Sequence, residues 1–178
     1  MTEHPVNNTE TSRIARNMIW LAWSVFIVLL AYFLEQYLQQ RRNPNQQVQG
    51  SIDNKGVREV RLVQNHRGHY YASGKINGKP VVFLLDTGAT SVSIPARLAD
   101  SLGLKRGKPV LVSTANGVTT AYATRVDRLE LGPIVITGLR GSINPNVEYD
   151  EVLLGMSVLK NLEIIQRGKQ LTIRQYPN

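Results

Sequence analysis

The stretch Val81-Val82-Phe83-Leu84-Leu85-Asp86-Thr87-Gly88-Ala89 gives the strongest indication of the fold of this chain of 178 residues. Its first five residues are all apolar, which predicts a strand buried on both faces. Asp86 ends that strand, and a glycine follows two residues later. Because glycine has no side chain, backbone N–H groups can approach the carboxylate closely. Such donors would fix the plane of the carboxyl group and leave its other oxygen free to react.

Three interpretations of this segment compete. The first is an ordinary turn, because Asp and Gly both favour turns; it does not explain why a carboxylate should end an apolar strand. The second is a phosphate-binding loop, because Asp-x-Gly-x-Thr resembles that of the actin and sugar-kinase superfamily. Proteins of that superfamily need two α/β lobes, which the β-rich remainder of this chain cannot supply. The third is catalysis by an aspartate carboxylate.

Composition excludes several other classes of protein. The chain has no cysteine, so a disulfide scaffold, a thiolate zinc site, an iron–sulfur cluster and a cysteine nucleophile are all ruled out. Apolar residues make up 42%, which is too many for a disordered chain. The net charge is +8, but the basic residues are dispersed and form no basic helix. We therefore expect a solvated basic surface and no nucleic-acid partner.

The N-terminal region predicts a membrane anchor. Residues 18–34 contain no charge, and Trp and Tyr lie towards both ends of the apolar stretch. We expect a tail over residues 1–17 and a single transmembrane helix over residues 18–38. A cleaved signal peptide fits less well, because no small-x-small pair follows the apolar run. Arginines flank both ends, so charge alone barely favours one orientation.

After this helix the sequence divides into a linker and one domain. Residues 39–56 are rich in Gln and poor in apolar side chains, so we expect a polar linker. Residues 57–178 are enough for one compact domain. Short apolar runs alternate there with turn signals, among them Asn77-Gly78, Asn116-Gly117 and Gly132-Pro133. This pattern predicts an all-β barrel or sandwich with short helices over residues 96–102 and 156–162.

Two motifs together resemble a known family. Leu84-Leu85-Asp86-Thr87-Gly88-Ala89-Thr90-Ser91 is similar to the active-site signature of retropepsin-like aspartic proteases, and Val152-Leu153-Leu154-Gly155-Met156 is similar to their second signature. The resemblance covers roughly residues 60–175. The N-terminal anchor, Thr-Ala-Asn-Gly and Leu-Leu-Gly-Met resemble the bacterial membrane-tethered members of this group. The resemblance implies a closed retropepsin-like β-barrel or sandwich and a bacterial inner-membrane protein with a periplasmic domain.

The aspartic protease mechanism needs two carboxylates, and the chain has one Asp-Thr-Gly. The other aspartates in the domain lack the following glycine. Asp86 is therefore expected to meet the Asp86 of a second copy in a two-fold homodimer. The resemblance implies that Thr87 supports this dyad across the interface and that Gly88 contacts the substrate backbone, with Ala89 beside it.

Asn116-Gly117 lies where such proteases carry a flap, so both residues are candidates for substrate binding; an ordinary hairpin is the alternative. Other polar groups receive structural interpretations. His66 and His69 lack an obvious third ligand, and Glu148, Asp150 and Glu151 are expected to form a solvated acidic loop. No metal and no cofactor is expected.

The sequence thus predicts a membrane-anchored aspartic endopeptidase that hydrolyses extended peptides with water. The alternative is a non-proteolytic peptide- or protein-binding module on the same fold. Complete retention of Asp-Thr-Gly-Ala favours the enzyme, because a pure binding module has no need of that carboxylate.

Overall fold

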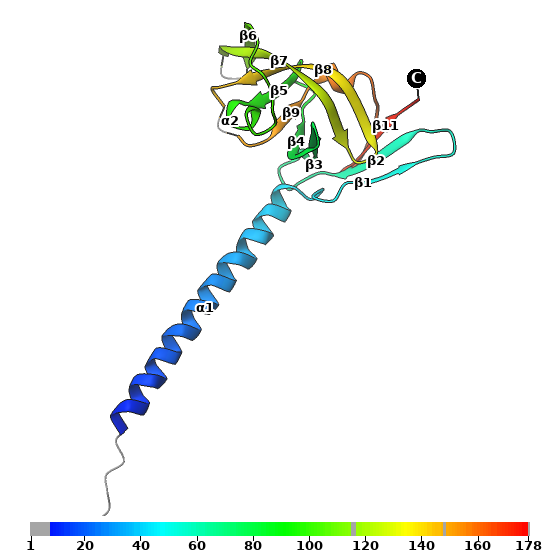
Figure 1. Ribbon diagram of the computed structural model, residues 1–178. Helices are drawn as coiled ribbons and strands as arrows, with labels where there is room; N and C mark the ends of the chain where they lie inside the picture. Colours follow the sequence, from blue (N-terminus) through cyan, green and yellow to red (C-terminus); the bar gives the residue numbers. More distant parts are fainter. Residues whose placement is uncertain (1–7, 115–116, 148, 178) are drawn as a thin grey trace, which may run out of the picture. The chain divides into compact units, whose positions relative to one another are not determined.

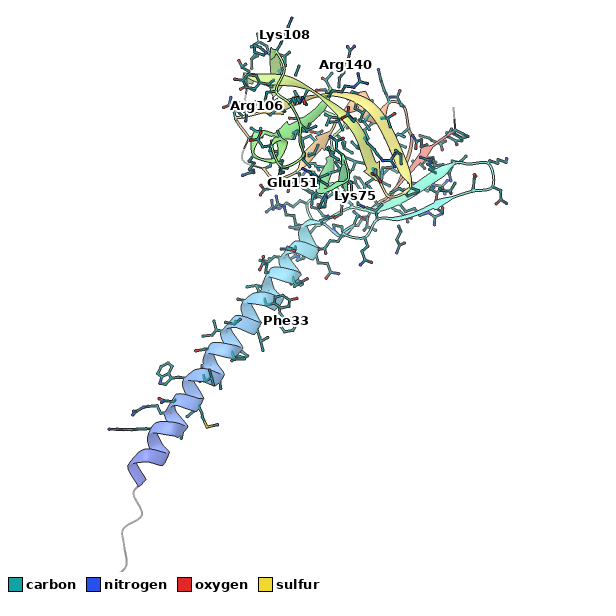
Figure 2. All side chains as sticks on the ribbon, in the orientation of Figure 1. Phe33, Lys75, Arg106, Lys108, Arg140 and Glu151 are labelled. Carbon is teal, nitrogen blue, oxygen red and sulfur yellow. The ribbon has the colours of Figure 1, made fainter. Side chains whose placement is uncertain are left out.

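The computed structural model describes residues 8–114, 117–147 and 149–177, and the chain divides into two units, residues 1–39 and 40–178. The first unit consists of most of helix α1, which spans Asn8–Arg42 (Figure 1). Its apolar side chains, Phe33 among them, are exposed (Figure 2). The window Ala15–Arg42 is long and apolar enough to cross a membrane. The helix extends beyond the expected residues 18–38 at both ends.

The second unit is mostly β-structure with two short helices. In chain order, its elements are β1 (Gln49–Ile52), β2 (Arg58–Val63), β3 (Tyr70–Ile76), β4 (Lys79–Leu85), β5 (Val92–Pro95), α2 (Ala96–Ala99), β6 (Pro109–Thr114), β7 (Gly117–Leu131), β8 (Ile134–Asn144), β9 (Val152–Leu154), α3 (Met156–Leu159), β10 (Glu163–Arg167) and β11 (Gln170–Gln175). Helices α2 and α3 are shorter than predicted, and turns complete both segments.

Seven of the strands form a sheet that closes on itself. Their order is β3-β4-β9-β5-β8-β7-β6, and β3 also pairs with β7 through Lys75–Glu130 and Ile76–Leu129. This extra pairing joins the first strand to the sixth, so the sheet curls around one core (Figure 1). The sequence predicted a barrel or a sandwich, and this strand pairing favours the barrel.

The other four strands form a separate sheet in the order β1-β2-β11-β10. All its pairings are antiparallel, and β11 lies between β2 and β10. Val60, Leu62, Leu171 and Ile173 from this sheet are buried and belong to the same core as the barrel strands. The sheet thus brings the two ends of the domain sequence together.

The turn signals in the sequence correctly located the hairpins. Asn77 has φ of 50° and Gly78 has φ of 79°, the left-handed conformations that a tight turn between β3 and β4 requires. The hairpins β6–β7 and β7–β8 also lie where the sequence predicts them. Strand β4 differs from the expectation, because Val82 and Leu84 on one face are only half-buried, as is Leu85 at its end.

The structure replaces the expected polar linker over residues 39–56 with ordered elements. Helix α1 continues to Arg42, and β1 pairs with β2. Asn43 and Asn45 are buried despite their polarity. Their amide side chains find hydrogen-bond partners inside the domain, which removes the usual cost of burying a polar group. Composition indicated a solvated linker because it does not show where such partners lie.

Asn45 joins the two sheets. Its Nδ2 donates to the carbonyl of Val63 on β2 at 2.9 Å and to that of Tyr71 on β3 at 2.6 Å. Its Oδ1 accepts from the Val63 amide at 2.7 Å, and its own carbonyl accepts from the Ser73 amide at 3.1 Å. Asn43 adds a bond from Nδ2 to Ser73 Oγ at 3.1 Å. Residues 43–45 are therefore part of the folded domain.

Candidate active site

Asp86 follows directly after β4, which lies between β3 and β9 in the barrel sheet. Strand β4 pairs in parallel with β9, in the register Phe83–Val152, Leu84–Leu153 and Leu85–Leu154. The Asp86 amide continues this ladder by donating to the Leu154 carbonyl at 3.1 Å. The two sequence signatures, far apart in the chain, thus lie side by side and fix where the backbone of Asp86 emerges from the sheet.

The loop after Asp86 is held by its own backbone. The Gly88 amide donates to Asp86 Oδ1 at 2.9 Å, and the Ala89 amide donates to the Asp86 carbonyl at 3.2 Å. An added Cβ at Gly88 would lie 3.2 Å from Asp86 Oδ1, which is a tight contact. The close approach of a backbone donor to the carboxylate that the sequence predicted is therefore present. It orients the carboxyl group relative to the loop.

The second signature supports the same loop from the other side. Helix α3 begins at Met156, and its first amide groups cannot bond within the helix. Met156 N donates to the Ala89 carbonyl at 2.8 Å, and Ser157 N donates to the Thr90 carbonyl at 2.9 Å. Gly155 lies between the strand and the helix, where a Cβ would be 2.5 Å from the Ala89 oxygen. This close packing explains why the signature needs glycine at that position.

The loop lies at the surface of the single chain. Thr87 and Gly88 are exposed, whereas Asp86 and Ala89 are half-buried. An extended ligand or a second protein can therefore approach the carboxylate from this side. The roles assigned from the sequence to Asp86, Thr87, Gly88 and Ala89 remain proposals.

The hairpin expected to act as a flap consists of β6 and β7, which pair from Pro109–Tyr122 to Thr114–Gly117. Asn116 lies outside the described residues. Gly117 has φ of 109°, a conformation that favours glycine. Leu111 and Val118 lie diagonally on one face of the hairpin and are 77% and 70% exposed. The hairpin thus presents apolar side chains to solvent.

The sequence analysis missed an ion pair beside the active-site strands. Glu151 was expected in a solvated acidic loop, but it is 4% exposed, and its carboxylate pairs with the Arg42 guanidinium at the end of α1. Asp150 pairs with Arg97 at 2.9 Å, and Glu148 lies outside the described residues. Charge alternation along the chain gave no signal for the Arg42–Glu151 pair, because 109 positions separate its members.

Tyr71 on β3 lies in the field of this ion pair. Burial raises the pKa of the Tyr71 hydroxyl, and the negative charge of Glu151 raises it further. The positive charges of Arg42 and Arg67 oppose that effect. The pKa of Tyr71 therefore depends on the charges of the Arg42–Glu151 ion pair. Asp86 is the only acid of the chain in an Asp-Thr-Gly sequence.

No metal-binding cluster of three His, Asp or Glu side chains occurs among the residues that the structure describes. His66 Nδ1 lies 3.2 Å from the Arg41 carbonyl oxygen. The His69 and Tyr71 rings pack edge to face, with their centroids 6.3 Å apart. Both histidines thus have structural partners.

Comparison with known proteins places this site in a family. Residues 72–161 match the family described as "gag-polyprotein putative aspartyl protease", and the chain belongs to that family. The fold is retropepsin-like: a solved structure of a retropepsin-like aspartic protease from Rickettsia conorii aligns with a TM-score of 0.56 and 23% identity. This alignment covers 71% of this chain and 94% of that one.

Two curated relatives are uncharacterised bacterial proteins. The chain is 32% identical over 126 residues to one from Sinorhizobium, which covers 68% of this chain and 54% of the relative. It is 27% identical over 123 residues to one from Rickettsia prowazekii, covering 67% and 52% respectively. The chain therefore spans about half the length of the curated relatives that it matches.

Proposed function

We propose that this protein is an aspartic endopeptidase, anchored in a membrane by α1, that hydrolyses peptide bonds between the Asp86 carboxylates of two copies of the chain. The observation that carries the proposal is the placement of Asp86. Its amide is fixed by Leu154, its Oδ1 accepts from Gly88, and the loop is open to a partner. Membership of the aspartyl protease family supports the same chemistry.

The mechanism follows from bringing two such carboxyl groups together. At a separation of about 3 Å they share one proton, because two like charges that close cannot both ionise. The ionised carboxylate takes a proton from water, and the protonated one polarises the scissile carbonyl. Water then attacks directly, so no covalent acyl-enzyme forms. Thr87 supports the dyad, and neither a metal nor a cofactor takes part.

The partners follow from this geometry. One Asp-Thr-Gly per chain requires an isologous dimer with Asp86 near the two-fold axis. Two chains confined to one membrane have a high effective concentration, which favours a weak dimer. The substrate lies as an added strand bound through its backbone, at Gly88 and Ala89 and beneath Asn116 and Gly117 of the β6–β7 hairpin.

The location in the cell is also part of the proposal. The exposed apolar surface of α1 fits a lipid environment, and the two curated relatives come from bacteria. We therefore propose a bacterial inner-membrane protein with its β-domain on the periplasmic side.

The test uses the full chain in detergent micelles, incubated with a diverse peptide mixture between about pH 3 and 7. Products are identified by mass spectrometry for the wild type and for Asp86→Asn, which keeps the size of the side chain but removes the ionisable group. Asp127→Asn is the matched control, because that carboxylate is 81% exposed and lies on β7. We expect cleavages that disappear only in Asp86→Asn.

Identical product lists for the folded wild type and Asp86→Asn would overturn the peptidase. That result would favour the alternative, a peptide-binding module on the same fold. Retention of peptides by both proteins in a pull-down experiment would then identify the binding function.

A further inference from the structure

Glu151 is a buried carboxylate beside the active-site strands. It is 4% exposed, and it immediately precedes β9. A charge removed from water is costly unless a well-placed opposite charge compensates it. The Arg42 guanidinium supplies that charge from the end of α1. The stability of the chain around residue 151 therefore depends on a residue outside the barrel.

Only a short stretch of backbone separates this ion pair from the candidate catalytic residue. Glu151 is followed by Val152-Leu153-Leu154, and the Leu154 carbonyl accepts the hydrogen bond from Asp86 N. Strand β9 pairs in parallel with β4 on one side, and Ser93 of β5 pairs antiparallel with Leu153 on the other. A displacement at Glu151 would therefore reach the Asp86 backbone along one three-residue strand.

Arg42 is held in place by the domain. Asn65 Nδ2 donates to the Arg42 carbonyl at 3.0 Å, which satisfies one of the unpaired carbonyls at the helix end. Asn65 Oδ1 in turn accepts from the amides of Arg67 and His69, both at 3.0 Å. The backbone just after Arg42 is held by the hydrogen bonds of the buried Asn43 and Asn45 side chains. The backbone of Arg42 is thus already ordered, so pairing with Glu151 has to order only the Arg42 side chain.

We propose that Arg42 is a positioning residue for the active site, acting through Glu151 and β9 on the backbone of Asp86. The effect on peptide hydrolysis rests on the proposed function, whereas the coupling to the Asp86 loop does not. The last turn of α1 is thus part of the apparatus that holds the candidate site.

The test compares four variants of the full chain in detergent micelles: Arg42→Gln, Glu151→Gln, the double variant, and Arg125→Gln as control. Arg125 is a suitable control because its ion pair with Asp127 is long, at 3.9 Å, and exposed on both sides. Hydrogen exchange measured by mass spectrometry reports on two segments, residues 82–90 and 150–156. Peptide hydrolysis by the same samples is the second measurement.

Arg42→Gln leaves a buried carboxylate without its partner. We expect exchange in both segments to rise roughly tenfold or more, and hydrolysis to fall in parallel. The double variant removes the remaining charge and should return exchange to within about threefold of the wild type. Glu151→Gln alone and Arg125→Gln should leave exchange nearly unchanged. If Arg42→Gln merely weakened the helix end, adding Glu151→Gln would not lower the exchange again.

Unchanged exchange in Arg42→Gln would overturn the proposal. So would equally raised exchange in Arg42→Gln and the double variant, since Arg42 would then act independently of Glu151. If Arg42→Gln fails to fold, the double variant decides: a folded double variant supports the coupling, and an unfolded one refutes it. A wild type without peptidase activity would contradict the proposed function only, because exchange at the Asp86 loop still measures the coupling.

Discussion

At Gly155, between β9 and α3, the backbone passes so close to the Asp86 loop that no side chain fits between them. An added Cβ would lie 2.5 Å from the Ala89 oxygen and 2.6 Å from the Ser91 oxygen. Both contacts are with backbone atoms, which cannot rotate away as a side chain can. Gly155 itself has φ of −87°, which alanine also adopts, so the need for glycine here is steric.

Gly155→Ala should therefore push the Asp86 loop away from α3. We expect the free energy of unfolding to fall by about 1–3 kcal/mol, the usual cost of overpacking. Peptide hydrolysis should fall more than this loss of stability explains, because the displaced loop carries Asp86. Chemical denaturation of the full chain and hydrolysis rates measured well below the unfolding temperature separate the two effects.

Gly168→Ala provides the comparison. A Cβ at Gly168 meets nothing within 4 Å, but φ is 59°, so the substitution costs only backbone strain of about 1–2 kcal/mol. Folded Gly168→Ala should keep the wild-type rate. Equal losses of hydrolysis in the two variants would refute the steric argument.

Among the elements, the four-stranded sheet is held by an ion network across its strands. Arg174 on β11 is opposite Glu59 on β2 and opposite Glu163 on β10. Its guanidinium bonds Glu59 Oε2 at 2.7 Å and Glu163 Oε2 at 3.3 Å, and Arg61 bonds Glu59 Oε1 at 2.8 Å. The hydrogen bond from Arg174 lowers the pKa of Glu59, burial opposes that shift, and Arg61 lowers the pKa further.

A lowered pKa in the folded state makes the contribution of Glu59 dependent on pH. The contribution is fully present above the ordinary value of 4.5 and is lost as the pH falls through the lower folded-state pKa. Arg174→Gln should lower the free energy of unfolding at pH 7, because it removes the hydrogen-bonded partner of the Glu59 carboxylate. The difference in free energy of unfolding between the wild type and this variant should shrink as the pH falls from about 6 to 3.

Urea denaturation at several pH values measures this difference. Arg128→Gln is the matched control, because it removes an arginine that pairs with Glu130 at 2.9 Å on β7, outside this sheet. A constant difference between the wild type and Arg174→Gln at all pH values would show that the network does not depend on the charge of Glu59.

For the whole molecule, the proposed chemistry requires two chains. Each chain contributes one Asp86, so a dimer that contains one Asp86→Asn subunit lacks half of the dyad. Equal amounts of wild type and Asp86→Asn, mixed at a constant total concentration and allowed to exchange subunits, should retain about a quarter of the wild-type activity, because random pairing gives that fraction of intact dimers.

The same experiment distinguishes a shared site from independent ones. Retention of about half the activity would indicate that each chain acts alone and would contradict the shared dyad. Mixing the wild type with Asp127→Asn should leave the activity unchanged, since that exposed carboxylate lies outside the proposed site.

Local patterns predicted the parts of the fold that depend on neighbouring residues. Asn77-Gly78 and Gly132 located turns because positive φ is a property of the residues in the turn. The strand before Asp86 and the approach of the Gly88 amide to its carboxylate were predictable for the same reason. Tertiary contacts were less accessible: β1, the burial of Asn43 and Asn45, and the pairing of Glu151 were all missed.

The apolar helix, the hairpins and the two signatures could be predicted from the amino-acid sequence, and with them the retropepsin-like family. These features depend on short-range periodicity, turn chemistry and motifs within a few residues. The tertiary structure alone decided that the end of α1 belongs to the domain and that Glu151 is buried against Arg42. Whether a polar side chain is buried depends on partners that folding brings from distant parts of the chain, and local composition does not identify these partners.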